Sequence, residues 1–225
     1  MSDLFSPVAV IIDISRSRTH PDRELLQREL NGVFAKVNEL QPGVQRIEPT
    51  VGDEFQAVYG HLGHAFRATL LARLFLPEQI DCRFGLGSGE IKIVGHSVVG
   101  AVQDGSAWWS AREAINEARK REYSKLGFVR TWFRVAEGLG GAALESSDRA
   151  IGEAAVNAYL LTRDHIINTM SARTRRLFRG QLLGETQQSL AREEGITQSA
   201  VSQNLAKSGA NALFASELLL LGSAQ

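Results

Sequence analysis

The chain has 225 residues, of which 44% are hydrophobic and 22% charged, and its formal net charge is +0 at pH 7. This composition is typical of a globular protein and excludes nucleic-acid binding by bulk charge, so any such contact must come from a local patch. The single cysteine, Cys82, excludes a disulfide framework, and we find neither a secretion signal nor an apolar run of about 18 residues, so we expect a cytoplasmic protein without a membrane span.

The chain opens with a continuous apolar run, PVAVIIDI at residues 7–14, which predicts a buried central strand. Asp13 lies at the end of this strand, where a charged residue rarely occurs without a task. An amphipathic helix is expected over residues 22–40, and Pro42-Gly43 ends it.

A Gly52-Asp53 pair then lies between two strand-like runs, residues 44–51 and 55–59, which predicts a β-hairpin with Asp53 at its tip. Glu54 follows directly, and two adjacent carboxylates repel each other unless a positive group lies between them. A metal ion is one such group. A solvated acidic turn is the alternative.

The next segments continue the alternation of helices and strands, giving the order β-α-β-β-α-β-β-α-β. This order predicts an α+β sheet with helices on one face. The expected elements are a helix over residues 64–76, strands over 81–86 and 90–94 joined by Gly87-Ser88-Gly89, a helix over 104–121 and a strand within 126–136.

From about residue 146 the pattern is helical to the end, so we predict two domains, residues 1–145 and 146–225. Helices are expected over 151–170, 172–183, 186–194, from Thr197 onward, and over 211–221. The last of these (NALFASELLLL) is apolar enough to suggest a homodimer contact.

The segment ETQQSLAREEGITQSAVSQNLAKSG has the layout of a helix-turn-helix, with Gly195 in the turn and Thr197 as the N-cap of the second helix. Amide and hydroxyl side chains on that helix can read base edges in double-stranded DNA, and a basic cluster upstream suits phosphates. A helical hairpin for protein contact is the alternative. The predicted DNA-binding residues are Arg175, Arg176, Thr186, Gln187, Thr197, Gln198, Ser199, Ser202, Gln203, Asn204 and Lys207.

Asp13 and Asp53 end neighbouring strands of the expected β-α-β-β unit, so both carboxylates can face the same side. Two such carboxylates with a backbone carbonyl between them suit Mg²⁺, which in turn can hold a nucleotide triphosphate. The sequence therefore predicts a magnesium and nucleotide site at this edge of the sheet.

Three segments, AVIIDISRS, PTVGDEFQAVY and CRFGLGSGEI, resemble the signature strands of class III nucleotidyl cyclases and the related GGDEF-type domains. The resemblance covers about residues 7–121 and implies a ferredoxin-like βαββαβ core in which Asp13 and Asp53 bind the metal. It also implies a role in binding the nucleotide, of ATP or GTP type. The residues concerned are Asp13, Ile14, Ser15, Arg16, Ser17, Arg18, Gly52 and Arg112.

The chain departs from the cyclase pattern in the groups that act on the nucleotide. Pro49 and Thr50 stand near the position where cyclases carry a purine-reading Lys, and Trp108 or Trp109 stands where they carry an Asn. These changes favour binding of a nucleotide without its conversion. The pairing of the two predicted domains also resembles the SatD family.

Together these features predict a transcriptional regulator whose degenerate cyclase-like domain senses a purine nucleotide with a divalent metal. Ligand binding would reposition two helix-turn-helix units of a homodimer. Two alternatives stay open: an active nucleotidyl cyclase or related phosphoryl-transfer enzyme fused to a DNA-binding domain, and a dimerisation platform in which Asp13 and Asp53 only satisfy buried hydrogen bonds.

Overall fold

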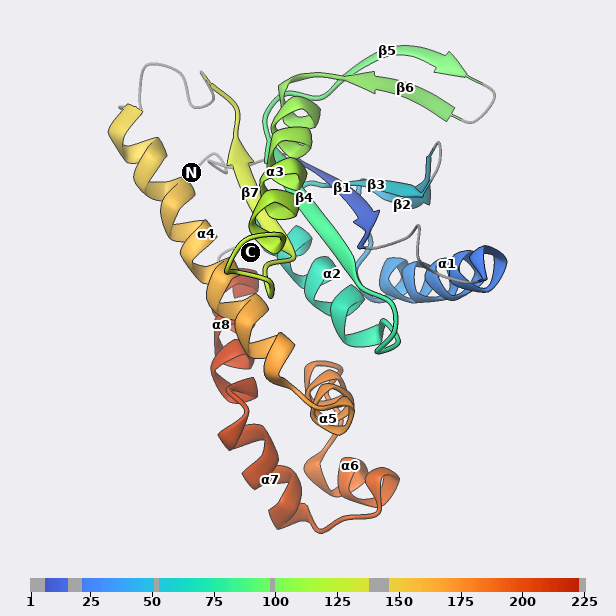
Figure 1. The fold of residues 1–225 in the computed structure, drawn as a ribbon, viewed down its shortest axis with the longest axis vertical. Coiled ribbons are helices and arrows are strands. Elements are labelled where there is room, and N and C mark those ends of the chain that lie inside the picture. The colour runs from blue at the N-terminus through green and yellow to red at the C-terminus, as the bar shows by residue number, and fades with distance from the viewer. Residues whose placement is uncertain (1–6, 16–21, 51–52, 98–99, 138–145, 223–225) are drawn as a thin grey trace.

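The computed structural model describes residues 7–15, 22–50, 53–97, 100–137 and 146–222. Within these residues the chain forms a mixed five-stranded sheet, a separate two-stranded hairpin and eight helices (Figure 1). The strands are β1 (Val8–Ile14), β2 (Gln45–Pro49), β3 (Glu54–Tyr59), β4 (Cys82–Ser88), β5 (Lys92–Ser97), β6 (Gly100–Asp104) and β7 (Thr131–Val135). The helices are α1 (Arg23–Leu40), α2 (Leu62–Phe75), α3 (Ser106–Glu122), α4 (Ser146–Thr169), α5 (Ala172–Leu182), α6 (Gln187–Glu194), α7 (Gln198–Lys207) and α8 (Ala210–Gly222).

The main sheet has the order β2-β3-β1-β4-β7, and only the β4–β7 pair is parallel. The prediction of an α+β fold is confirmed. β1 lies at the centre, and all seven of its residues are buried. A central strand that is buried on both faces explains why its sequence is a continuous apolar run.

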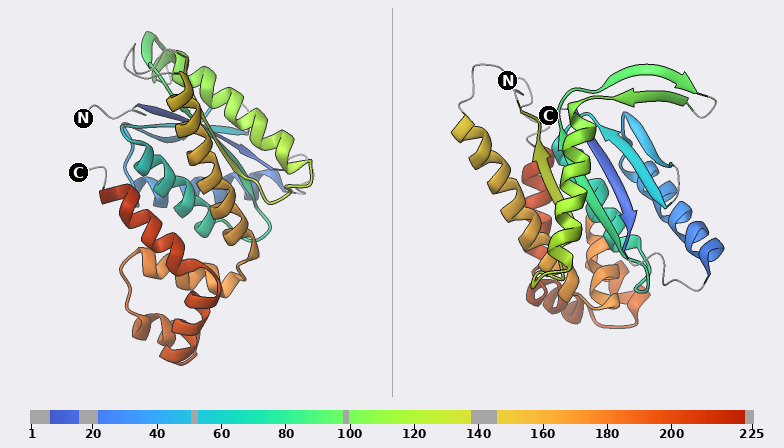
Figure 2. Two further views of the ribbon diagram at one scale, coloured as in Figure 1. Left: turned by 90° about the vertical axis from the view of Figure 1, so that its left-hand side faces the viewer. Right: turned by 45° about the horizontal axis from the view of Figure 1, so that its top comes forward.

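Helices cover both faces of the sheet, so the prediction that they lie on one face is wrong for α3. Val8, Val10 and Ile12 of β1 point into the core shared with α1 and α2, whereas Ala9 and Ile11 pack against α3. Figure 2 shows α3 and the pair α1 and α2 on opposite sides of the strands.

Close contact between α3 and β4 depends on two glycines in the strand. A Cβ on Gly87 would lie 2.2 Å from the carbonyl oxygen of Ala107, and a Cβ on Gly85 would lie 2.3 Å from that of Ala111. Because no side chain fits there, these glycines let the helix backbone lie directly on the strand. Ala107 and Ala111 are the small residues that α3 brings to this contact.

Strand β6 is missing from the predicted order. It pairs with β5 in a hairpin that is not part of the main sheet and extends away from it (Figure 1). Ile93 and Val94 of β5 are exposed, 63% and 61%. A strand with exposed apolar residues does not follow the alternating apolar pattern from which a half-buried strand is predicted.

Helix α4 covers β7, which is one of the two edge strands of the sheet. Asn157 accepts a hydrogen bond from the Phe133 backbone N–H (2.9 Å) and donates to its carbonyl (3.0 Å), while Asp164 accepts from the backbone N–H of Thr131 (2.6 Å). These side chains satisfy backbone groups that an edge strand leaves open. The domain boundary at residue 145 stays a prediction. Helix α4, which follows it, packs against the sheet.

The helices α4 to α8 form a second core with the C-terminal half of α2. Leu70 and Leu74 of α2 pack with buried residues of α4 to α8. In α8, Leu213 is buried in this core and Leu220 packs against the first one, so contacts within the chain account for much of the apolar character that we attributed to a dimer contact.

Candidate functional site

The end of β1 carries the predicted metal and nucleotide residues. In the strand register Asp13 lies opposite Glu54 on β3 and opposite Arg83 on β4. Directly opposed residues share a face of the sheet, and Asp13 lies two residues after Ile11, so it shares the face on which Ile11 packs against α3. Asp13 is therefore 7% exposed between the sheet and α3.

Arg83 binds the groups that the predicted metal would need. Its Nε donates to Asp13 Oδ1 (2.7 Å), its Nη2 to Asp13 Oδ2 (3.3 Å) and to the Ile14 carbonyl (3.4 Å), and its Nη1 to Glu122 Oε2 (2.7 Å). Burial by itself lowers the pKa of Arg83, but the hydrogen bonds to Asp13 and Glu122 outweigh it and raise that pKa above its ordinary value. The guanidinium therefore stays charged.

Two further arginines, both on α3, bind carboxylates at the end of β1 and the start of β3. Arg119 Nη2 also donates to Asp13 Oδ2, and Arg112 holds Glu54 through two hydrogen bonds of 2.6 and 2.8 Å. The hydrogen bonds to Glu54 raise the pKa of Arg112. Residues 112, 119 and 122 lie seven and three positions apart, the spacing of one helix face, which is why α3 delivers them to the same side.

A fourth arginine closes the layer on the other side of Glu122. Arg130 lies 3.6 Å from Glu122 and pairs with Asp81, while the Ser15 hydroxyl donates to Glu122 (2.6 Å). The layer thus combines four arginines with four carboxylates. Its charged members are Asp13, Glu54, Asp81, Glu122, Arg83, Arg112, Arg119 and Arg130.

The residues at this place do not fit a bound Mg²⁺. Both oxygens of Asp13 and the carbonyl of Ile14 accept hydrogen bonds from arginine, and the cross-strand partner of Asp13 is Glu54, not Asp53. Asp53 precedes β3 and is partly buried. Across the described residues, no group of three or more His, Cys, Asp or Glu side chains could hold a metal ion.

The structure brings together only some of the residues predicted to bind a nucleotide. Asp13, Ile14, Ser15 and Arg112 belong to the charged layer or border it. Arg16, Ser17, Arg18 and Gly52 lie outside the described residues.

The predicted DNA-binding residues gather on α6 and α7 and on the turn between them. Thr186 and Thr197 are the N-caps of the two helices, accepting hydrogen bonds from the backbone N–H groups of Ser189 and Ala200 (3.1 Å each). Gly195 ends α6 with φ 64°, a left-handed conformation that glycine adopts without strain.

The outward side of α7 is polar, whereas its inward residues Val201 and Leu205 are buried. Asn204 of α7 and Gln187 of α6 are both half-buried. The exposed polar residues of α7 are Gln198, Ser199, Ser202, Gln203 and Lys207.

The basic cluster on α5 is largely engaged within the chain. Arg176 donates two hydrogen bonds to Glu194 (2.6 and 2.8 Å), which lower the pKa of Glu194, and Arg173 lies 3.4 Å from the same carboxylate. Arg175 donates to the Ile167 carbonyl (3.4 Å). These two predicted phosphate contacts, Arg175 and Arg176, therefore have partners in the free protein.

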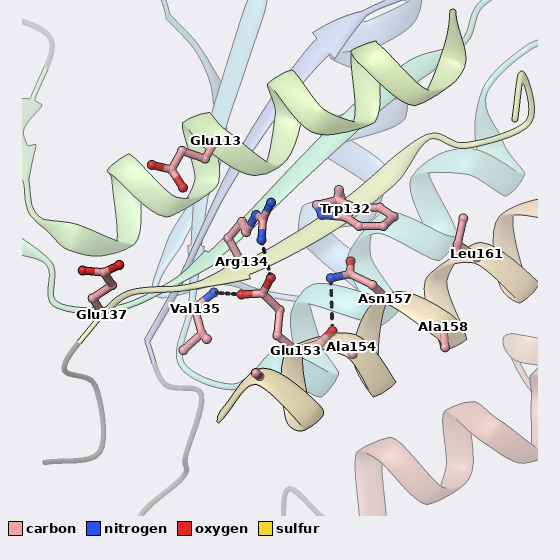
Figure 3. Close-up of a pocket in the computed structure, with 11 residues that line it drawn as sticks. Glu113, Trp132, Arg134, Val135, Glu137, Glu153, Ala154, Asn157, Ala158 and Leu161 are labelled. Atoms are coloured by element: carbon pink, nitrogen blue, oxygen red, sulfur yellow. Dashed lines mark hydrogen bonds and ion pairs between the residues drawn. The ribbon is translucent and has the colours of Figure 1, made fainter. Parts of the chain in front are cut away.

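A pocket of about 570 Å³ lies between α3, β7 and α4 (Figure 3). Its floor includes Trp132, and its polar groups include Glu113 and the ion pair of Arg134 with Glu153 (2.6 Å). None of the predicted site residues lines it, because we did not anticipate that α4 would pack beside β7.

Sequence reasoning missed several residues of the candidate site, namely Asp81, Arg83, Arg119, Glu122 and Arg130. Arg83 could have been found by the argument applied to Asp13, since it too is a charge within a buried apolar strand. The two residues of α3 carry no such signal, because charged residues are common on an amphipathic helix.

Comparisons with known proteins bear on the family of the chain. Among the helices of the described residues, none is both long and apolar enough to cross a membrane. A comparison with curated proteins found no match. The sequence model of the SatD family matches residues 7–217. Since this match spans most of the sequence, the chain belongs to the SatD family.

Proposed function

We propose that this chain is a DNA-binding transcriptional regulator whose sheet domain senses a purine nucleotide. The observation that carries the DNA-binding part is the exposed polar face of α7. A helix with Gln198, Ser202 and Gln203 on its outer side offers amide and hydroxyl groups that can donate to and accept from base edges in the major groove.

The packing around α7 supports a helix-turn-helix. The Ile196 N–H donates to the Ala191 carbonyl (3.0 Å), which closes the turn after α6. Leu190 of α6 and Val201 of α7 are buried with Phe178 of α5 in the second core, so these three helices pack together while the outer side of α7 stays exposed. This arrangement holds a recognition helix rigidly against two supporting helices.

Local charge favours DNA over a protein partner for this surface. From Ser171 to Gly209 the sequence has six basic and three acidic residues, although the whole chain is neutral. An excess of positive charge near an exposed polar helix attracts phosphates, whereas a protein-binding helix more often presents apolar anchors.

The nucleotide-sensing part rests on the sheet domain. The antiparallel order β2-β3-β1-β4, with α1 and α2 on one face, supports the proposal of a ferredoxin-like βαββαβ unit and with it the cyclase-like assignment. Arg112 and Arg119, whose side chains are 50% and 52% exposed, are the groups available to phosphates. The proposed assembly is a homodimer, for which the exposed Leu218 of α8 is a candidate contact.

A salt titration on a pool of mixed-sequence duplexes tests the proposed DNA surface. We expect affinity that falls with salt, and a slope that is smaller by about 1 in Lys207→Ala, because one phosphate contact is lost. Lys125→Ala is the matched control, since Lys125 is an exposed lysine near the end of α3. Equal effects of the two substitutions, or no binding at low salt, would contradict the proposal.

Calorimetric titration with ATP and GTP tests nucleotide sensing. Binding that weakens in Arg112→Ala supports it, because the half-exposed guanidinium of Arg112 is a proposed phosphate contact. Steady release of a cyclic product in the same mixture would instead support the enzyme alternative.

A further inference from the structure

We propose that the guanidinium of Arg83 takes the place of a divalent cation at the end of β1, so that this edge of the sheet binds its ligand without Mg²⁺ or Mn²⁺. The assignment of Arg83 stands on the geometry of the charged layer alone. The part that concerns the ligand, a phosphate-bearing molecule, rests on the proposed nucleotide sensing.

The contacts of Arg83 reproduce those of a metal ion in kind. One carboxylate (Asp13), one backbone carbonyl (Ile14) and a second carboxylate (Glu122) all accept hydrogen bonds from it, at 2.7 to 3.4 Å. These are oxygen donors of the type that a hard cation prefers. The planar guanidinium fork also matches a carboxylate edge, which a single ammonium group does not.

The position of Arg83 leaves no room for an added dication. Arg83 is 4% exposed and Asp13 7%, so the pair is enclosed between β1, β4 and α3. A divalent ion bound to Asp13 would lie within a few ångströms of the guanidinium, where like charges repel strongly. Binding of the ion would require Arg83 to leave its buried site.

The charge of the layer supports the same conclusion. Four arginines face four carboxylates, so the layer is neutral without any ion. Arg112 and Arg119 are half exposed at its outer side, where they can exchange a carboxylate partner for a phosphate. A phosphate-bearing ligand would therefore be held by guanidinium groups alone.

Titration with Mn²⁺, followed by electron paramagnetic resonance, tests the assignment of Arg83. We expect no saturable site in the unaltered chain, and a new site in Arg83→Ala, where Asp13, Glu122 and the Ile14 carbonyl lose their shared donor. Adding Asp13→Asn to that variant should abolish the new site. The unfolding midpoint of Arg83→Ala should rise by about 5–10 °C at an Mn²⁺ concentration about 100-fold above its dissociation constant.

Three results would overturn the assignment. The first is saturable Mn²⁺ binding by the unaltered chain that Asp13→Asn removes, and the second is a folded Arg83→Ala that gains no site. The third applies if Arg83→Ala does not fold with or without Mn²⁺, and it is a saturable Mn²⁺ site in Arg83→Lys. Because this variant keeps one positive charge at residue 83, the absence of such a site supports the assignment.

Nucleotide titration in EDTA and in millimolar Mg²⁺ tests the part that concerns the ligand. Affinities that agree within about twofold support it, and a loss of about tenfold or more in EDTA would overturn it. Absence of nucleotide binding in both buffers would contradict nucleotide sensing itself, while the Mn²⁺ titration still decides the role of Arg83.

Discussion

Asp164 is a buried carboxylate that binds several groups of neighbouring elements. It is 0% exposed, accepts hydrogen bonds from the backbone N–H groups of Arg130 (2.7 Å) and Thr131 (2.6 Å), and pairs with Arg73 (2.8 Å). Arg163, also 0% exposed, lies 3.4 Å from it. One carboxylate thus compensates two buried guanidinium groups and fixes the start of β7 to α4.

Asp164→Asn should destabilise the protein by about 3–5 kcal/mol, because it removes the carboxylate charge that lies 2.8 Å from the buried Arg73 and 3.4 Å from the buried Arg163. Urea unfolding followed by circular dichroism measures this change. Glu193→Gln, at an exposed position of α6, is the control and should change the free energy of unfolding by less than about 0.5 kcal/mol. Equal stabilities of the two variants would contradict the role assigned to Asp164.

Glu217 gives the protein a predicted pH dependence of its stability. Burial raises the pKa of Glu217 above its ordinary value of 4.5, against the opposing effects of Arg163, the Tyr159 hydrogen bond and Arg67. The folded state therefore holds this proton more tightly than the unfolded state does. Stability from this group is present below pH 4.5 and is lost as the pH rises through the raised pKa of the folded state.

Glu217→Gln should remove this loss and raise the free energy of unfolding at pH 7 by about 1 kcal/mol, because a neutral amide is buried more cheaply than a carboxylate. Unfolding curves between pH 4 and pH 8 measure the difference. A difference between variant and parent that does not change with pH would show that Glu217 carries no such dependence.

At the residue scale, Asp13 could be singled out from the sequence, but its partners could not. A charge in a buried strand reveals itself by contrast with its apolar neighbours. Which residue neutralises it depends on the strand register, and a shift of one residue would have brought a different side chain opposite it. For that reason we predicted Asp53 as the partner, whereas Arg83 and Arg119 donate hydrogen bonds to Asp13.

At the element scale, the close packing of α3 on β4 yields a prediction about stability. Gly87→Ala places a Cβ within 2.2 Å of the α3 backbone, so the helix must shift, and we expect a loss of about 1–3 kcal/mol or more. Gly95→Ala on β5 is the matched control, because a Cβ there meets nothing within 4 Å. Comparable thermal unfolding midpoints for the two variants would refute the close packing of α3.

The positions of helices such as α1 and α3 followed from the sequence because each buries an apolar stripe that recurs at the helical period, whereas α2 packs in both cores and is buried over most of its length. The N-cap Thr197 and the Gly195 that ends α6 could also be predicted, since capping depends on local chemistry, whereas Thr186 was predicted inside the helix and is its N-cap. The face on which α3 lies was not predictable in this way. It depends on the paired glycines of β4, whose role is visible only once the helix is in place.

At the scale of the whole molecule, α4 joins the sheet to the helices that follow. Arg130 pairs with Asp81 and lies 3.6 Å from Glu122 in the charged layer, and its backbone N–H donates to Asp164 of α4. The charged layer and α4 are therefore connected through one residue. A ligand that rearranges the layer has a direct physical route to the helix that carries α5 to α8.

Selection of duplexes from a random-sequence pool tests the central claim, that α7 reads DNA. We predict that the unaltered chain enriches a defined sequence, with two half-sites about 10 base pairs apart if it acts as a dimer. The double variant Gln198→Ala, Gln203→Ala should remain folded and bind weakly without enriching that sequence, because it keeps the charges but loses the base-reading amides. Enrichment of the same sequence by the double variant, or of none by the unaltered chain, would contradict the account.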